Sequence, residues 1–138
     1  MMKAWALPSF FCLIFYGLWG FLGAKASELA NAKTVFVISC VGSMIAGLIA
    51  IPLISTRIEI TTVNMSLSLL TGLATGFGTL MFMYALQRGP VIPIIMITAL
   101  YPVVTIFLAM LFLNQAITLK QGIGIVFSLI AIYCLTIS

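Results

Sequence analysis

The side chains that usually carry out chemistry are nearly absent from this sequence. It contains no His and no Asp, and its only carboxylates are Glu28 and Glu59. Ser-His-Asp catalysis, the H-E-x-x-H zinc site and EF-hand calcium loops are therefore excluded. Cys12, Cys40 and Cys134 lie inside apolar runs, and we interpret them as small buried hydrophobic residues rather than as disulfides or metal ligands. We therefore expect a protein that is not an enzyme and that holds no metal or other cofactor.

The composition explains this shortage. Of 138 residues, 64% are hydrophobic and 6% are charged, whereas a soluble domain carries roughly 25% charged residues. The net charge of +4 is spread singly along the chain, so it forms no surface for nucleic acid. The basic residues are Lys3, Lys25, Lys33, Arg57, Arg88 and Lys120. The sequence therefore predicts an all-α integral membrane protein, with the lipid bilayer as its solvent.

Five apolar stretches are long enough to cross a bilayer, whose core of about 30 Å needs about 20 helical residues. Only short loops remain, so we expect a single five-helix domain over residues 1–138. The first stretch exceeds the roughly 7–15 apolar residues of a signal peptide, and we interpret it as a retained helix. Between the third and fourth stretches, Gly89 and Pro90 predict a tight hairpin. The predicted spans are residues 4–24, 34–54, 65–86, 91–113 and 120–137.

Lysine and arginine are balanced between the two sides that five spans would define. Lys3, Arg57 and Lys120 fall on one side, and an equal number of basic residues falls on the other. Since the asymmetry of basic residues between short loops sets the orientation of a membrane protein, two interpretations stay open. One or two charges near the helix ends dominate and fix one orientation, or the chain inserts both ways and assembles as an antiparallel pair.

Each predicted helix has one face of small or weakly polar residues and one of large apolar residues. Without a hydrophobic effect inside lipid, small residues let helices approach closely, so we assign Gly72, Gly76, Gly124 and Ser128 to helix packing. In the first, third and fourth spans, bulky amphipathic groups share the weakly polar face, which is equally compatible with packing and with a substrate cavity. The candidate substrate-binding residues are Tyr16, Trp19, Thr71, Thr75, Thr79, Thr98, Tyr101 and Thr105.

Pro102 is the sharpest local feature, because it lies in the middle of the fourth span. A proline has no N–H and clashes with the carbonyl group four residues earlier, here that of Thr98. Inside a membrane, irregular backbone is tolerated where protein or a water-filled cavity satisfies it, and broken helices build the binding sites of many transporters. We therefore predict a kink that is either functional or a feature of packing.

No carboxylate, His or basic residue lies in the middle of any predicted span. Because such residues usually mark proton relays or ion pathways, proton coupling through a buried Glu is disfavoured. If the protein recognises a substrate, it must use aromatic faces, hydroxyl groups and exposed carbonyl groups.

Three short motifs resemble one repeat of the EamA-type drug/metabolite transporters. They are Trp19-Gly20, Tyr84-Ala85-Leu86 followed by Gly89-Pro90, and Ala99-Leu100-Tyr101-Pro102-Val103. The likeness continues from Leu111 through Gly124, and so covers nearly the whole chain. One position departs from the family, since Asn114-Gln115 stands where members commonly carry Gly-Glu before the fifth helix.

The resemblance implies an inverted-repeat transporter, of which this chain supplies one five-helix repeat, located in the cell membrane. It also implies a small-molecule substrate, alternating access, and a partner that is a second copy or a paralogous half. Small single-repeat proteins of the superfamily also serve as subunits that move lipid-linked carriers. An accessory membrane subunit that only packs against a larger partner therefore stays open as an alternative.

Overall fold

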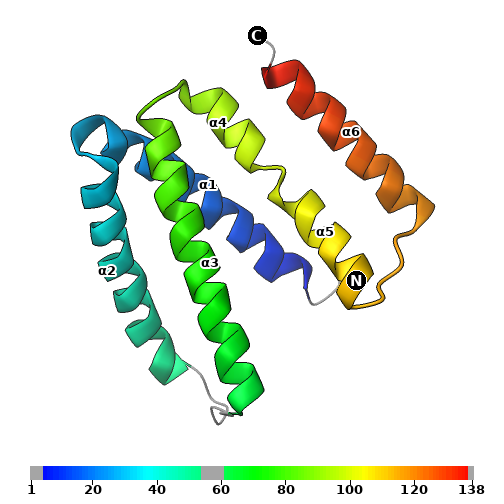
Figure 1. The fold of residues 1–138 in the computed structure, drawn as a ribbon, viewed down its shortest axis with the longest axis horizontal. Helices are drawn as coiled ribbons and strands as arrows, with labels where there is room; N and C mark the ends of the chain where they lie inside the picture. The colour runs from blue at the N-terminus through cyan, green and yellow to red at the C-terminus, as the bar shows by residue number, and fades with distance from the viewer. Residues whose placement is uncertain (1–4, 54–60, 137–138) are drawn as a thin grey trace. The chain divides into compact units, whose positions relative to one another are not determined.

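The computed structural model describes residues 5–53 and 61–136, and all regular structure within these ranges is helical (Figure 1). Four stretches are long and apolar enough to cross a membrane, and the last helix is a shorter apolar one. The prediction of an all-α, five-span membrane fold is confirmed. Lys3, Arg57 and Glu59 lie outside the described residues. The helices are α1 (Ala6–Leu29), α2 (Ala32–Ala50) with the 3-10 turn η1 (Ile51–Leu53), α3 (Thr62–Leu86), α4 (Val91–Thr98), α5 (Tyr101–Phe112) and α6 (Leu119–Thr136).

Polar side chains fix where the helices begin. At the start of α2, the Asn31 Oδ1 atom accepts a hydrogen bond of 2.9 Å from the backbone N–H of Thr34. At the start of α3, the Thr61 hydroxyl accepts one of 3.2 Å from the N–H of Asn64. The first turn of a helix has N–H groups without a partner in the helix, and such side chains satisfy them. Because of these caps, α2 and α3 begin two or three residues before the apolar stretches predicted from the sequence.

The fourth span is broken into α4 and α5 at Ala99 and Leu100. These two residues keep φ values near those of a helix, but their ψ angles are −4° and −9°. The turn is held by hydrogen bonds between residues three apart, as in a 3-10 helix. They run from Leu100 N to Ile97 O at 3.1 Å and from Val103 N to Leu100 O at 3.0 Å. Pro102 comes two residues later, in the first turn of α5, where its missing N–H is tolerated. The predicted kink is therefore a break that starts three residues before Pro102.

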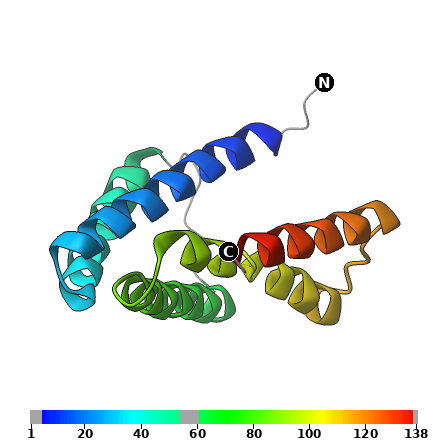
Figure 2. The ribbon, with the colours of Figure 1, turned by 90° about the horizontal axis from the view of Figure 1, so that it is seen from above.

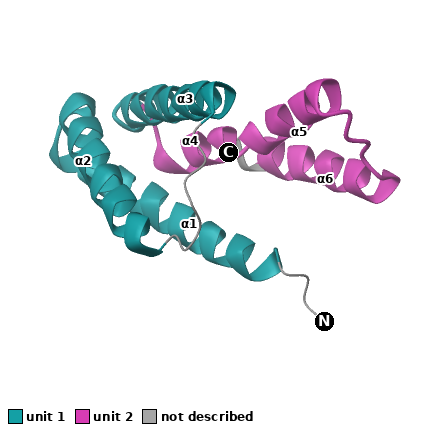
Figure 3. Ribbon diagram, turned by 90° about the horizontal axis from the view of Figure 1, so that it is seen from below, with its two compact units in different colours: residues 1–88 teal, residues 89–138 magenta. Residues whose placement is uncertain are grey.

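The chain forms two compact units, residues 1–88 and 89–138 (Figure 3). In the first unit, α1 approaches α2 and α3 along its C-terminal half and diverges from α3 toward its N-terminus (Figures 1 and 2). Burial follows this geometry, since the buried residues of the unit gather at the end where α1 meets α2 and where α3 ends. They are Gly20, Gly23, Ala24, Ala32, Val35, Phe82, Met83 and Leu86.

The three cysteines are free and exposed on the surface of the protein. The expectation that they are buried is therefore wrong, although no disulfide forms among the described residues. The reason is that the chain itself covers few of its apolar side chains, and lipid must cover the rest. A thiol that faces lipid is still away from water, so its preference for an apolar environment is met.

Candidate functional site

Trp19 lies at the contact between α1 and α3. Its ring stacks on that of Phe82, with centroids 5.0 Å apart and planes at 22°, and its side chain is 40% exposed. Gly23, one turn further along α1, allows this approach, because a Cβ atom there would lie 2.9 Å from the Cε atom of Met83. Tyr16, one turn before Trp19, is 61% exposed. The fold therefore holds one side of Trp19 in a contact and leaves Tyr16 free.

Two threonines of α3 use their hydroxyl protons within their own helix. Thr71 donates to the carbonyl oxygen of Leu67, and Thr75 donates to that of Thr71, both at 2.9 Å. Thr71 and Thr75 are exposed, and Thr79 is half-buried. Such bonds to the preceding turn are common for threonine in helices. The lone pairs of the two donating hydroxyl oxygens stay available, so each hydroxyl group can accept a hydrogen bond from a ligand.

In the second unit, the same pattern holds on α4 and α5. The Thr98 hydroxyl donates to Ile94 O at 2.9 Å and to Ile95 O at 3.0 Å, and the Thr105 hydroxyl donates to Tyr101 O at 3.2 Å. Thr98, Tyr101 and Thr105 are all exposed. None of them lines a cavity identified among the described residues.

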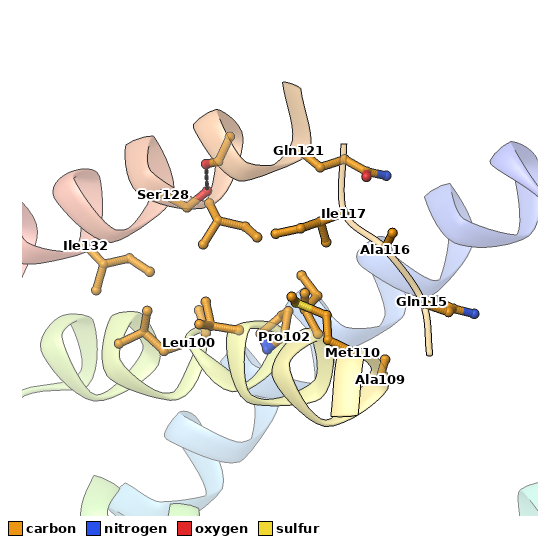
Figure 4. A pocket seen from close by; sticks show the side chains of 15 residues that line it. Leu100, Pro102, Ala109, Met110, Gln115, Ala116, Ile117, Gln121, Ser128 and Ile132 are labelled. Atoms are coloured by element: carbon orange, nitrogen blue, oxygen red, sulfur yellow. Dashed lines mark hydrogen bonds between the residues drawn. The ribbon is translucent and has the colours of Figure 1, made fainter. Parts of the chain in front are cut away.

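A cavity of about 480 Å³ lies in the second unit, with α5 and the turn that precedes it on one side and α6 on the other (Figure 4). We call it the α6 groove. Of the predicted residues, it is lined by Pro102, Gly124 and Ser128. The Ser128 hydroxyl donates to Gly124 O at 2.9 Å, and a Cβ atom at Gly124 would meet no other atom within 4 Å. Gly124 and Ser128, which we assigned to helix packing, therefore face this open space within the unit.

The two predicted packing glycines of α3 differ in their surroundings. A Cβ atom at Gly76 would lie 4.0 Å from the ring of Phe36 on α2, whereas one at Gly72 would meet nothing within 4 Å. Gly76 therefore faces α2, and the face that carries Gly72 is open within the first unit.

The segment between α5 and α6 closes one end of the α6 groove. Asn114 adopts a left-handed backbone conformation with φ 50°, which only glycine, asparagine and aspartate adopt readily. Asn114 therefore suits the position at which the resemblance to EamA-type transporters implies a Gly. Thr118 and Gln121 then begin α6 with a capping box: Gln121 Oε1 accepts from Thr118 N at 2.8 Å, and Thr118 Oγ1 accepts from Gln121 N at 3.4 Å. The spacing Thr-x-x-Gln before an apolar run is the sequence signal for this cap.

Charged side chains stay at the helix ends throughout the part of the chain that the structure describes. Lys25 and Glu28, near the end of α1, form an exposed ion pair at 2.6 Å. The guanidinium carbon of Arg88 lies 5.3 Å from the centre of the Tyr84 ring. No group of three or more possible metal ligands occurs among the described residues. Binding at the predicted residues would therefore rest on aromatic faces and hydroxyl oxygens.

Comparison with known proteins identifies the family. The model of the EamA-like transporter family matches residues 3–137. The chain belongs to the EamA-like transporter family. This confirms the resemblance drawn from the short motifs, and the chain is accordingly a multi-pass membrane protein of a transporter family. An uncharacterised protein of Methanocaldococcus jannaschii is 29% identical over 128 residues, which are 91% of this chain and 90% of that protein. No solved structure matches.

Membership in the EamA-like family does not assign a role to single residues. The candidate binding residues lie on α1 and α3 of the first unit and on α4 and α5 of the second. Their role in binding stays a prediction. Sequence reasoning missed Gln115, which lines the α6 groove together with Gln121.

Proposed function

We propose that this EamA-like chain forms one half of a transporter that moves a small metabolite, amino-acid-like or drug-like, across the cell membrane by alternating access. Its partner in this proposal is a second copy in the opposite orientation or a paralogous half. The observation that carries the proposal is the family match over residues 3–137, nearly the whole chain. The protein from M. jannaschii aligns with this chain over nine-tenths of its length.

The distribution of charge supports an antiparallel pair. Lys25, Lys33 and Arg88 lie at the end of the first unit where α1 meets α2 and where α3 ends. The Gln87 side chain joins these two loops, because its Nε2 atom donates to Ala30 O at 2.7 Å. In this proposal these three basic residues share one side of the membrane, and they equal in number the three that the sequence analysis assigns to the other. A chain with equal charge on both sides has little preference between the two orientations.

Aromatic faces and hydroxyl oxygens are the groups that we propose for recognition. Tyr16 and Tyr101 are more than half exposed, and aromatic faces stack on planar or cationic groups. The bonded threonine hydroxyls donate to their own helices, so a substrate would meet them as acceptors. A substrate with ammonium or amide N–H groups beside an apolar part fits these partners best.

The test is a flux screen with the purified protein in liposomes, combined with topology reporters. We expect uptake of at least one amino-acid-like or cationic aromatic solute. We also expect C-terminal reporters on both sides of the membrane to give signal, and two lysines added at the C-terminus should bias the population to one orientation. Reporter signal from one side only would exclude the antiparallel homodimer, and flux that is absent with every solute would argue against transport by this chain alone.

The accessory-subunit alternative draws on one observation. Trp19 has one face against Phe82, so this aromatic group already has a structural role and does not need a substrate. In that case the protein would show no flux alone and would remain stably bound to a larger membrane protein. Restored flux in the reconstituted complex would then assign transport to the partner.

A further inference from the structure

The α6 groove exists because the fourth span is broken. α6 packs against α4, whereas it has few close approaches to α5. The chain changes direction at Ala99 and Leu100, where ψ departs from the helical value. The space that opens between α5 and α6 has a volume of about 480 Å³, which is within the range of small-molecule sites.

The walls of the α6 groove are hydrocarbon along most of its length. Leu100, Val103 and Ile106 line one side, and Ile125 and Ile132 line the other. No charged side chain lines it. Ser128 of α6 lines the groove, but its hydroxyl group donates its proton to the backbone carbonyl oxygen of Gly124. A ligand that fills this space must therefore be apolar over most of its length.

Polar groups lie at one end only. Figure 4 shows Gln115 and Gln121 at the end that leads into the α5–α6 loop, with Leu100 and Ile132 at the other. The Gln121 Oε1 atom already accepts hydrogen bonds from Thr118. This side chain therefore offers a ligand the donor protons of its NH₂ group. Lys120, next to Gln121 in the first turn of α6, is exposed and adds a positive charge at this end.

We propose that the α6 groove binds one acyl chain of a phospholipid, with the lipid head group at Gln115, Gln121 and Lys120. Inside a bilayer an empty groove loses the dispersion contacts of its walls, and its apolar walls offer no partners to water. The nearest hydrocarbon is a lipid chain. The amide donors and the lysine complement an anionic phosphate and orient that chain with its head toward the loop. The site does not depend on the proposed transport activity, since it requires only that the chain spans a membrane.

The test uses a phosphatidylglycerol whose acyl chain carries a photoactivatable diazirine, mixed into nanodiscs with the full-length protein. After illumination and proteolysis, mass spectrometry locates the labelled residues. We expect label at Val103 and Ile125 in excess over Val104 and Val126, which are exposed and do not line the groove. Excess labelling of roughly threefold to tenfold corresponds to one net hydrogen bond to the head group.

Two variants with a matched control make the test specific. Gly124→Leu fills the groove, and Gly122→Leu is the control, because a Cβ atom at either position would meet nothing within 4 Å but only Gly124 lines the groove. We expect Gly124→Leu to abolish the excess label and Gly122→Leu to keep it. Gln121→Glu keeps the capping box, which accepts Glu as well as Gln, but replaces the donor with a negative charge. It should lower the label several-fold.

Equal labelling of groove and control positions, or an excess that survives Gly124→Leu, would overturn the proposal. So would cross-links from a photoreactive residue at position 125 to protein instead of lipid, since these would show that another helix or a second copy fills the groove. Flux separates this proposal from the transport function: loss of the bound lipid with normal flux leaves transport standing, and absence of flux with normal lipid labelling counts only against transport.

Discussion

Replacement of Pro102 by alanine tests whether the break between α4 and α5 has a function. Alanine has the N–H group that proline lacks, so residue 102 could donate a hydrogen bond to the carbonyl oxygen of Thr98, four residues earlier. The gain in the free energy of unfolding should be about 1 kcal/mol, for one net hydrogen bond, because Pro102 lies in the first turn of α5 and not in a helix interior. Ala99 and Leu100 already have right-handed helical φ angles, so no steric barrier opposes a continuous helix. The variant should be more stable and should transport less, since a straight helix cannot bend during alternating access.

Two measurements in one preparation check this, with Pro93→Ala as the control. Pro93 is the third residue of α4, where a proline costs a helix little, so its replacement should change stability by less than about 0.5 kcal/mol. For Pro102→Ala we expect a higher thermal midpoint in detergent and slower amide exchange at residues 99–103, together with reduced flux. If exchange at these residues stays as fast as before, the proline is not what breaks the helix. A straightened helix with unchanged flux would make the break a packing feature.

Four other outcomes follow from the same geometry. Tyr101→Ala should weaken the apparent affinity for substrate very roughly 3-fold to 30-fold, because it removes an aromatic face worth about 0.5–2 kcal/mol; an unchanged affinity in the flux assay would remove this residue from the site. Trp19→Ala should lower the thermal midpoint as well as affinity, because its ring stacks on Phe82, whereas Trp19→Phe should spare the midpoint. Flux should be flat from mildly acidic to mildly basic pH, because the predicted binding residues include no carboxylate, His or basic side chain; a steep pH profile would contradict the assignment. Gly23→Leu should destabilise the first unit by about 1–3 kcal/mol through overpacking, and Gly17→Leu, where a Cβ atom meets nothing within 4 Å, should be tolerated when thermal midpoints are compared.

Hydropathy located the helices well, but it did not locate their ends. The first apolar stretch ends at Ala24, whereas α1 continues to Leu29. Lys25 and Glu28 extend it, since they form an i,i+3 ion pair and both residue types favour helices. A hydropathy pattern reports which residues lipid can cover, and a helix continues wherever its backbone bonds and caps allow.

The α6 groove could not be predicted, although its ingredients were visible. Pro102 indicated that the fourth span is irregular, and Gly124 and Ser128, four residues apart, share one face of the last span. A helical wheel gives the face on which a residue lies, but not which face of another helix lies opposite. That depends on the direction that α5 takes after the break, which is set by packing between helices. The same limit explains why the sequence left open whether the face of Trp19 packs against another helix or lines a cavity; in the structure its ring stacks on that of Phe82.

The uneven burial of the first unit has a mechanical consequence. Its buried side chains gather at one end, and there the hydrogen bond from Gln87 to Ala30 and the close approach of Gly23 to Met83 fasten the helices together. α1 is held at that end, whereas the side chains of its N-terminal half are mostly exposed. Changes in lipid composition should swing this half of α1 against α3, while the turn between α1 and α2 stays as it is.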